Sequence, residues 1–294
     1  VRLSIQPLLS TGRLVRARLW QRPDQYILDE KTFIQYFPND EYKQEADPAT
    51  WATGKEIWNN FITTDASGKV AADLKKSGPG WYQVTATTVD RYGDTVTDKA
   101  TIYLVDTKAK QLAVPAYLTT LQDKKVIQPG ETANLLLGSS AGKLFIIQQK
   151  ENAGEDQLTA SQLPFSKRFN ILGLDNTLLL QSLTATEADR GGIGWMHFFV
   201  KDNRFYSIQN GFAVPWLNKE LDIQVGTYRD KTLPGSEEKW TVRISGLKGE
   251  KVAAELLTSM YDASLDQFAP HQWNPPSLWP MYWSRESWSA DASF

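Results

Sequence analysis

The side chains that most often carry out nucleophilic or metal chemistry are scarce in this sequence. It has no cysteine, so disulfides, cysteine-ligated zinc, thiol nucleophiles and thioesters are excluded within these 294 residues. Of the two histidines, His197 lies in the apolar, strand-like run WMHFFV, and His271 follows a proline in a loop. A Ser-His-Asp triad cannot be assembled convincingly from histidines in such settings. We therefore interpret His197 as a hydrogen-bonded structural residue.

Four carboxylates offer one acid–base hypothesis. Asp29, Glu30, Asp40 and Glu41 could pair as the acid and base of a glycosidase. They are better explained as helix-start and solvent-facing charges, because negative charge is stabilised near the first turn of a helix. We expect no enzymatic activity.

Motifs that bind metals, nucleotides or nucleic acids are also missing. There is no calcium loop of the D-x-D-x-D-G type. The cluster RGGIG, Arg190 to Gly194, lacks the third glycine of a dinucleotide fingerprint and the Lys-Ser/Thr of a P-loop, so we interpret it as a tight turn. The net charge is −2 with interspersed signs. The sequence therefore predicts no cofactor, no metal and no nucleic-acid partner.

Alternating polarity indicates β-sandwich domains in series. The stretch QPGETANLLLGSS has a near echo in LPGSEEKWTVRIS, and in each a Pro-Gly pair opens an alternating run. The pairs Pro129-Gly130 and Pro234-Gly235 stand about 100 residues apart, the length of one immunoglobulin-like sandwich. We expect both pairs to be structural turns at the first hairpin or strand entry of a domain. No run of about 18 apolar residues predicts a membrane span.

The sequence accordingly predicts an all-β chain of serial antiparallel sandwiches divided at 1–110, 111–217 and 218–294. In the first, Tyr82 to Leu104 predicts a hairpin around Tyr92-Gly93-Asp94. A short helical insertion is expected at about 26–62, where Asp47-Pro48 is a plausible helix start and Trp58 and Phe61 stand at helical spacing.

The second and third units follow the same reasoning. In the second unit, one strand is expected directly after Pro129-Gly130, and others at AYLTTL, KLFIIQQ, TLLLQSL, WMHFFV and RFYSIQ. Lys201-Asp202-Asn203 is expected to form a hairpin turn between the last two. In the third, Val252 to Met260 has helical spacing, yet a strand through Leu256 to Tyr261 followed by one helical turn fits equally well.

The residues resemble a known family. Motifs including PGWYQVTATTVDRYGD, TEADRGGIGWMHFFVKDNRFYS and KVAAELLTSMYDASLDQFAPHQW together resemble bacterial alpha-2-macroglobulins over nearly the whole chain. The resemblance implies seven-stranded macroglobulin-type domains, the third of them incomplete, and it favours a strand in the ambiguous stretch of the third. The chain begins with Val1, which favours a fragment of a longer protein.

The resemblance also implies a function. Family members trap proteases by exposing a bait segment, collapsing around the protease and, in many cases, capturing it through a Cys-Gln thioester. Because this chain has no cysteine, the resemblance implies a scaffold segment upstream of the bait region. Its implied partners are proteases, through the parent protein, and other domains of that protein. The implied location is periplasmic or extracellular.

Tryptophan supports an alternative from another class. Eleven tryptophans are present, and exposed indole rings can stack on sugars or anchor a protein partner. The candidates for an interaction surface are Trp273, Trp279, Trp283 and Trp288. The alternative function is thus an extracellular sugar- or surface-binding sandwich array. The competing interpretation is that these rings pack in domain cores or between domains.

Overall fold

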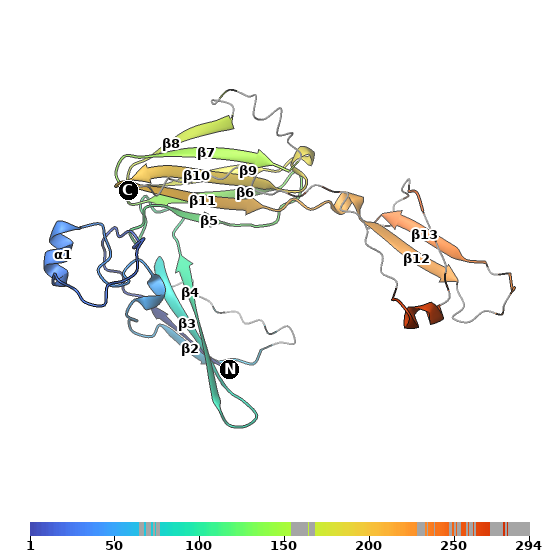
Figure 1. Cartoon of the computed structure of the whole chain (residues 1–294), viewed down its shortest axis with the longest axis horizontal. Helices are drawn as coiled ribbons and strands as arrows, with labels where there is room; N and C mark the ends of the chain where they lie inside the picture. The colour runs from blue at the N-terminus through green and yellow to red at the C-terminus, as the bar shows by residue number, and fades with distance from the viewer. Residues whose placement is uncertain are drawn as a thin grey trace.

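The fold is all-β with antiparallel sheets, as the sequence predicts (Figure 1). This computed structural model describes residues 1–64, 68, 72, 74, 77–153, 164, 168–227, 233, 235–237, 239–246, 249, 251, 254–256, 258, 261, 263–270, 279 and 281. Within that part of the chain, no helix is long and apolar enough to cross a membrane. Two bodies matter for the site: an N-terminal unit built on one sheet, and a middle sandwich of two sheets.

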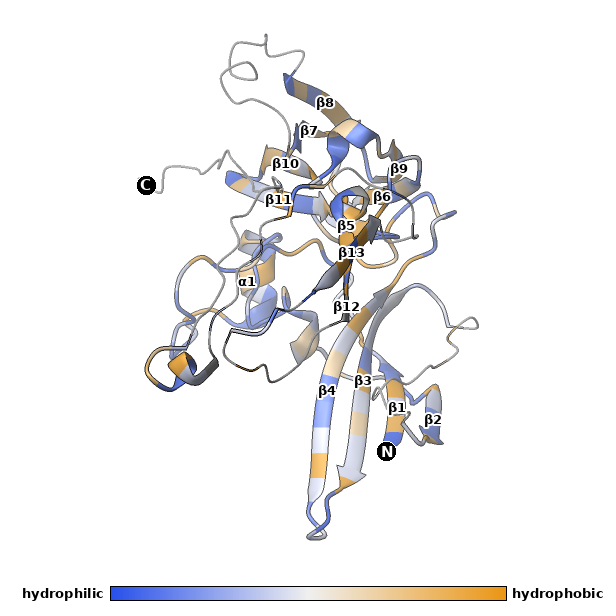
Figure 2. Cartoon of the chain, turned by 90° about the vertical axis from the view of Figure 1, so that its right-hand side faces the viewer, coloured by the Kyte–Doolittle hydropathy of each residue, from blue (hydrophilic) through white to orange (hydrophobic). Residues whose placement is uncertain are grey.

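The N-terminal unit contains one four-stranded sheet in the order β2-β1-β3-β4. Its strands are β1 (Arg2–Pro7), β2 (Trp58–Phe61), β3 (Gly80–Val89) and β4 (Thr95–Leu104). The predicted hairpin is confirmed: β3 and β4 pair in register, and Gly93, with φ of 93°, lies in the turn between them. Figures 1 and 2 show that this hairpin projects away from the middle sandwich.

The predicted helical insertion is only partly helical. It holds α1 (Glu30–Tyr36), whose first turn is capped by the Asp29 side chain, and a 3₁₀ helix (Pro48–Thr50) capped by Asp47. The helical interpretation of Trp58 and Phe61 is wrong, because both belong to strand β2. Pairing of β2 with β1 along four residues overrides the local spacing.

Among its described residues, the middle sandwich has seven strands in two facing sheets. One sheet has the order β11-β10-β7-β8 and the other β5-β6-β9. The strands are β5 (Thr119–Gln122), β6 (Thr132–Ser139), β7 (Leu144–Asn152), β8 (Phe169–Leu174), β9 (Thr177–Thr184), β10 (Ile193–Lys201) and β11 (Arg204–Phe212). All were expected from the sequence except β8. Inward-facing side chains of both sheets form one core: Leu135, Leu137, Ile146, Trp195, Phe199 and Phe212 are among its buried members.

Beyond the middle sandwich, the described residues form a two-stranded sheet. It consists of β12 (Leu221–Thr227) and β13 (Thr241–Gly246), preceded by a 3₁₀ turn (Leu217–Lys219). A second 3₁₀ helix (Ala263–Gln267) supplies the predicted helical turn. In the ambiguous stretch before it, Ala254 to Leu256, Thr258 and Tyr261 are neither helix nor strand, and the other residues there lie outside the described part.

Candidate functional site

The best-defined site is the joint between the N-terminal unit and the middle sandwich. At its centre is the predicted turn between β10 and β11, where Asp202 and Asn203 both adopt left-handed backbone conformations, with φ of 48° and 56°. Two left-handed residues in a two-residue turn match the twist of a β-hairpin. The Asp202 carboxylate accepts hydrogen bonds from the Tyr117 hydroxyl at 2.6 Å and from the Asn39 amide at 3.2 Å. The turn therefore contacts the N-terminal unit directly.

Arg16 connects the two units. Its guanidinium forms an ion pair with Asp40 and donates through Nη1 to the backbone carbonyl of Asp202. The hydrogen bond that Arg16 donates to Asp40 raises the pKa of Arg16 above its ordinary value, so this side chain stays charged. Arg204 of β11 donates in the opposite direction, to the carbonyl of Ala17. Leu14 adds apolar contact by packing against the core of the sandwich.

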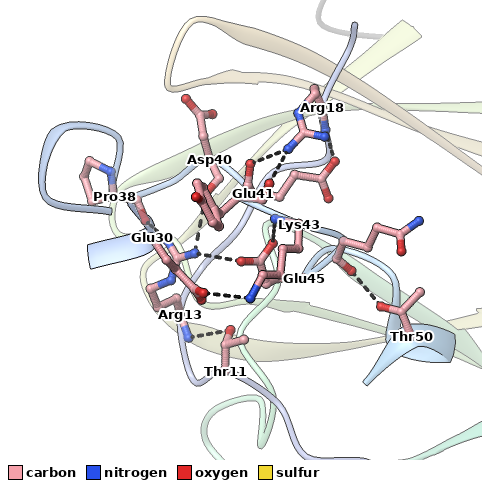
Figure 3. A network of polar contacts seen from close by, with 12 residues as sticks. Thr11, Arg13, Arg18, Glu30, Pro38, Asp40, Glu41, Lys43, Glu45 and Thr50 are labelled. Atoms are coloured by element: carbon pink, nitrogen blue, oxygen red, sulfur yellow. Dashed lines mark hydrogen bonds and ion pairs between the residues drawn. The ribbon is translucent and has the colours of Figure 1, made fainter. Parts of the chain in front are cut away.

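Two more arginines fix the loop that carries Asp40 (Figure 3). Arg13 donates to the carbonyl of Pro38 at 2.6 Å. Arg18 donates to the carbonyls of Glu41 and Tyr42 at 2.9 and 2.8 Å. The segment 13–18 and the loop 38–45 are thus joined at several points. Together they form a surface of fixed shape beneath the β10–β11 turn.

The four carboxylates considered as a glycosidase pair have separate structural roles. Asp29 caps α1, and its pKa is lowered by hydrogen bonds from Thr32. Glu30 forms an ion pair with Lys43 at 2.9 Å, shown in Figure 3. Asp40 is not solvent-facing as expected: its side chain is 14% exposed and paired with Arg16, because the joint covers it. Glu41 accepts a hydrogen bond from the Arg18 backbone at 2.8 Å, so each of the four carboxylates has a partner within the protein.

A cavity of about 340 Å³ lies at the joint and is lined by both units. Both units contribute aromatic side chains to its walls: Trp51, Trp81 and Tyr103 from the N-terminal unit, and Tyr117, Phe199 and Tyr206 from the middle sandwich. Burial raises the pKa of Tyr103, Tyr117 and Tyr206 above the ordinary value, so their hydroxyls remain protonated. The charged lining residues are Arg13, Arg16 and Glu45.

His197 has the structural role that the sequence predicts. It is fully buried, and the Gln148 amide donates to its Nε2 at 2.8 Å. Burial lowers the pKa of His197 to about 4, so the ring is neutral near pH 7. The first residues of RGGIG form the expected turn, with Gly191 and Gly192 at φ of 94° and 127°, whereas Ile193 and Gly194 already belong to strand β10. Among the described residues, no cluster of three or more metal-ligating side chains occurs.

The structure places only some of the predicted site residues. Pro129 and Gly130 form a turn, and Gly130 and Gly235 have φ of 87° and 75°. The Trp279 ring stacks on Trp216 at 5.5 Å, with Lys219 5.3 Å from its centroid, so this tryptophan has packing partners. Pro234, Trp273, Trp283 and Trp288 lie outside the described residues.

Sequence reasoning did not identify the joint. Asp202 and Asn203 were recognised as a turn, but nothing in their local pattern predicts contact with residues 186 positions away, as in the hydrogen bond from Arg16 to Asp202. The only local signal was the arginine-rich segment GRLVRARLW. Comparison with known proteins adds no assignment: no protein-family model matches the chain, and no curated protein does.

Proposed function

We propose that the chain is a scaffold segment of a bacterial alpha-2-macroglobulin-like protease trap and has no catalytic chemistry of its own. The observation that carries this proposal is the seven-stranded antiparallel sandwich whose β10–β11 turn is fastened to the preceding unit. Seven strands is the number that the family resemblance implies for each domain. A trap needs neighbouring domains held at defined angles, and the joint is suited to that mechanical task.

The polar contacts at the joint support a scaffold more than an enzyme. Asp40 is paired with Arg16 of its own unit, and Asp202 accepts from Asn39 across the interface and from Tyr117 on its own side, so both carboxylates have structural partners. Charge-assisted hydrogen bonds in a partly buried setting hold geometry well, because breaking one leaves a desolvated charge. In this proposal the partners are proteases, reached through the parent protein, and the location is periplasmic or extracellular.

The test compares the complete gene product that carries this chain with the chain alone. Each is incubated with several proteases, and the remaining activity is measured on a small peptide and on a large protein substrate. For the complete protein we expect activity on the large substrate to fall while the small substrate is still cleaved, because a caged protease admits only small molecules. The chain alone should change neither activity. Unchanged cleavage of both substrates by every protease, with the complete protein present, would contradict the proposal.

A further inference from the structure

The cavity at the joint has the size and walls of a small-molecule site. Its volume of about 340 Å³ lies at the lower end of the range of roughly 300–1,000 Å³ typical of ligand pockets. The Trp81 and Tyr103 rings lie 4.9 Å apart on the side of the N-terminal unit, and the Tyr117 and Tyr206 rings stack at 5.1 Å on the sandwich side. A ligand in the cavity would therefore meet aromatic surface from both units.

Three polar atoms of lining residues lack hydrogen-bond partners in the part of the chain that the structure describes. They are the buried Oε1 of Glu45 and the buried hydroxyls of Tyr103 and Tyr206. Glu45 Oε2 accepts from the Lys43 backbone at 2.7 Å, but Oε1 is 3.9 Å from the nearest guanidinium nitrogen of Arg13. A buried polar group without a partner is costly, so each such group favours a molecule that can pair with it. Here the requirement is a donor for Glu45 and polar partners for the two tyrosine hydroxyls.

The charges in the lining select a neutral ligand. Arg16 is engaged by Asp40 and by the Asp202 carbonyl, and Arg13 by the Pro38 carbonyl, so an anion meets no free bidentate donor. A cation would meet these two guanidinium groups against the single carboxylate of Glu45. Hydroxyl groups can donate to Glu45 and pair with Tyr206 without introducing charge.

We propose that this cavity binds a neutral pyranose sugar, one ring in size, as a free monosaccharide or as the terminal residue of a glycan. The apolar face of such a ring suits an aromatic wall, and its hydroxyls suit Glu45 and Tyr206. The described lining residues include none of the tryptophans that the sequence suggests as an interaction surface. It does not depend on the scaffold proposal, since a joint could carry such a ligand in any multidomain protein.

Titration calorimetry on the full chain tests the proposal, with D-glucose, D-galactose and N-acetylglucosamine as probes, each also as its methyl glycoside. We expect saturable binding of at least one probe at millimolar concentration. Binding of a methyl glycoside as well as the free sugar supports recognition of a glycan end, and binding of the free sugar alone supports a monosaccharide. No saturable binding by any probe means a water-filled cavity only and overturns the proposal.

Tyr206→Phe locates the site. The change removes only a hydroxyl that has no partner among the described residues and keeps the ring stacked on Tyr117, so the melting temperature should not fall. Binding should weaken about tenfold, the loss expected for one hydrogen bond. Tyr36→Phe, in the exposed helix α1, is the matched control and should bind as the original chain does. Binding that survives Tyr206→Phe and is lost in Trp279→Ala would place the sugar elsewhere and overturn the proposal.

Discussion

Gly130 shows how a single residue can be required for its backbone alone. Its φ is 87°, and no atom lies within 4 Å of the place where a Cβ would stand. Gly130→Ala should therefore destabilise the chain through backbone strain and not through a clash, by about 1–3 kcal/mol. Urea unfolding measures the difference. Gly173→Ala in β8 is the control, since that site is equally open without a left-handed φ, and its free energy of unfolding should not fall by a comparable amount.

His197 makes stability depend on pH. Its pKa of about 4 in the folded protein lies below its ordinary value of 6.5, so between these pH values only the unfolded chain takes up the proton. Stability from this residue is therefore present above pH 6.5, is lost as pH falls and levels off below about 4. The full loss is about 3 kcal/mol at 1.36 kcal/mol per pKa unit.

Urea unfolding at pH 7, 5.5 and 4.5 follows that loss. His197→Gln keeps a polar side chain beside Gln148 and cannot titrate in this range. It should be less stable at pH 7, because its fit is poorer, yet show a flatter profile. If the profile of the variant falls as steeply as that of the original chain, the pH dependence belongs to other groups.

At the scale of elements, the turn between β10 and β11 serves both the hairpin and the joint. Glycine adopts a left-handed φ without steric cost, so Asp202→Gly should not strain the turn. The change removes the carboxylate that accepts the Tyr117 and Asn39 hydrogen bonds. We expect faster hydrogen–deuterium exchange in the loop 38–45, with exchange in β10 and β11 unchanged.

Asn176→Gly is the matched control for this turn variant. Asn176 also has a left-handed φ, 46°, but stands between β8 and β9 and makes no described contact with the N-terminal unit. It should leave exchange in the loop 38–45 unaltered. Equal exchange in both variants would mean that the Asp202 carboxylate does not hold the joint.

The sequence correctly predicts the elements that are determined by residues close together in the chain. The hairpins at Gly93 and at Asp202 follow from alternation on either side of a turn, and both are present. Trp58 and Phe61 were misassigned because the prediction used only their local helical spacing. Their strand structure depends on pairing with β1, which is distant in the sequence. β8 was missed because FNILGL is too short and irregular to stand out from loop sequence. The joint and its cavity depend on contacts between distant segments, which no single-sequence pattern reports.

At the scale of the whole molecule, Arg16 should make the two units unfold together, because it pairs with Asp40 in its own unit and donates to the Asp202 carbonyl of the middle sandwich. The side chains of the Arg16–Asp40 pair are 23% and 14% exposed, and removing the cation leaves Asp40 covered without its partner. Arg16→Gln should therefore weaken the joint by about 2 kcal/mol. In scanning calorimetry we expect a transition shared by the N-terminal unit and the middle sandwich to separate into two.

Lys43→Gln is the control for that experiment. Its pair with Glu30 has exposed side chains, so solvent and salt already screen the attraction. The calorimetric profile should change little. A single undivided transition for Arg16→Gln would show that the units remain coupled without this side chain, through the Asn39–Asp202 and Arg204–Ala17 hydrogen bonds and the packing of Leu14.

The arginines of the joint region share a feature that bears on how the sequence can drift during evolution. Arg13, Arg16, Arg18 and Arg204 all donate to main-chain carbonyls, at Pro38, Asp202, Glu41, Tyr42 and Ala17. A carbonyl is supplied by any amino acid, so substitutions at the accepting positions keep the acceptor, whereas loss of an arginine removes the donor. Selection on this region should therefore favour the donors, with the four arginines retained among relatives while Pro38 and Ala17 vary.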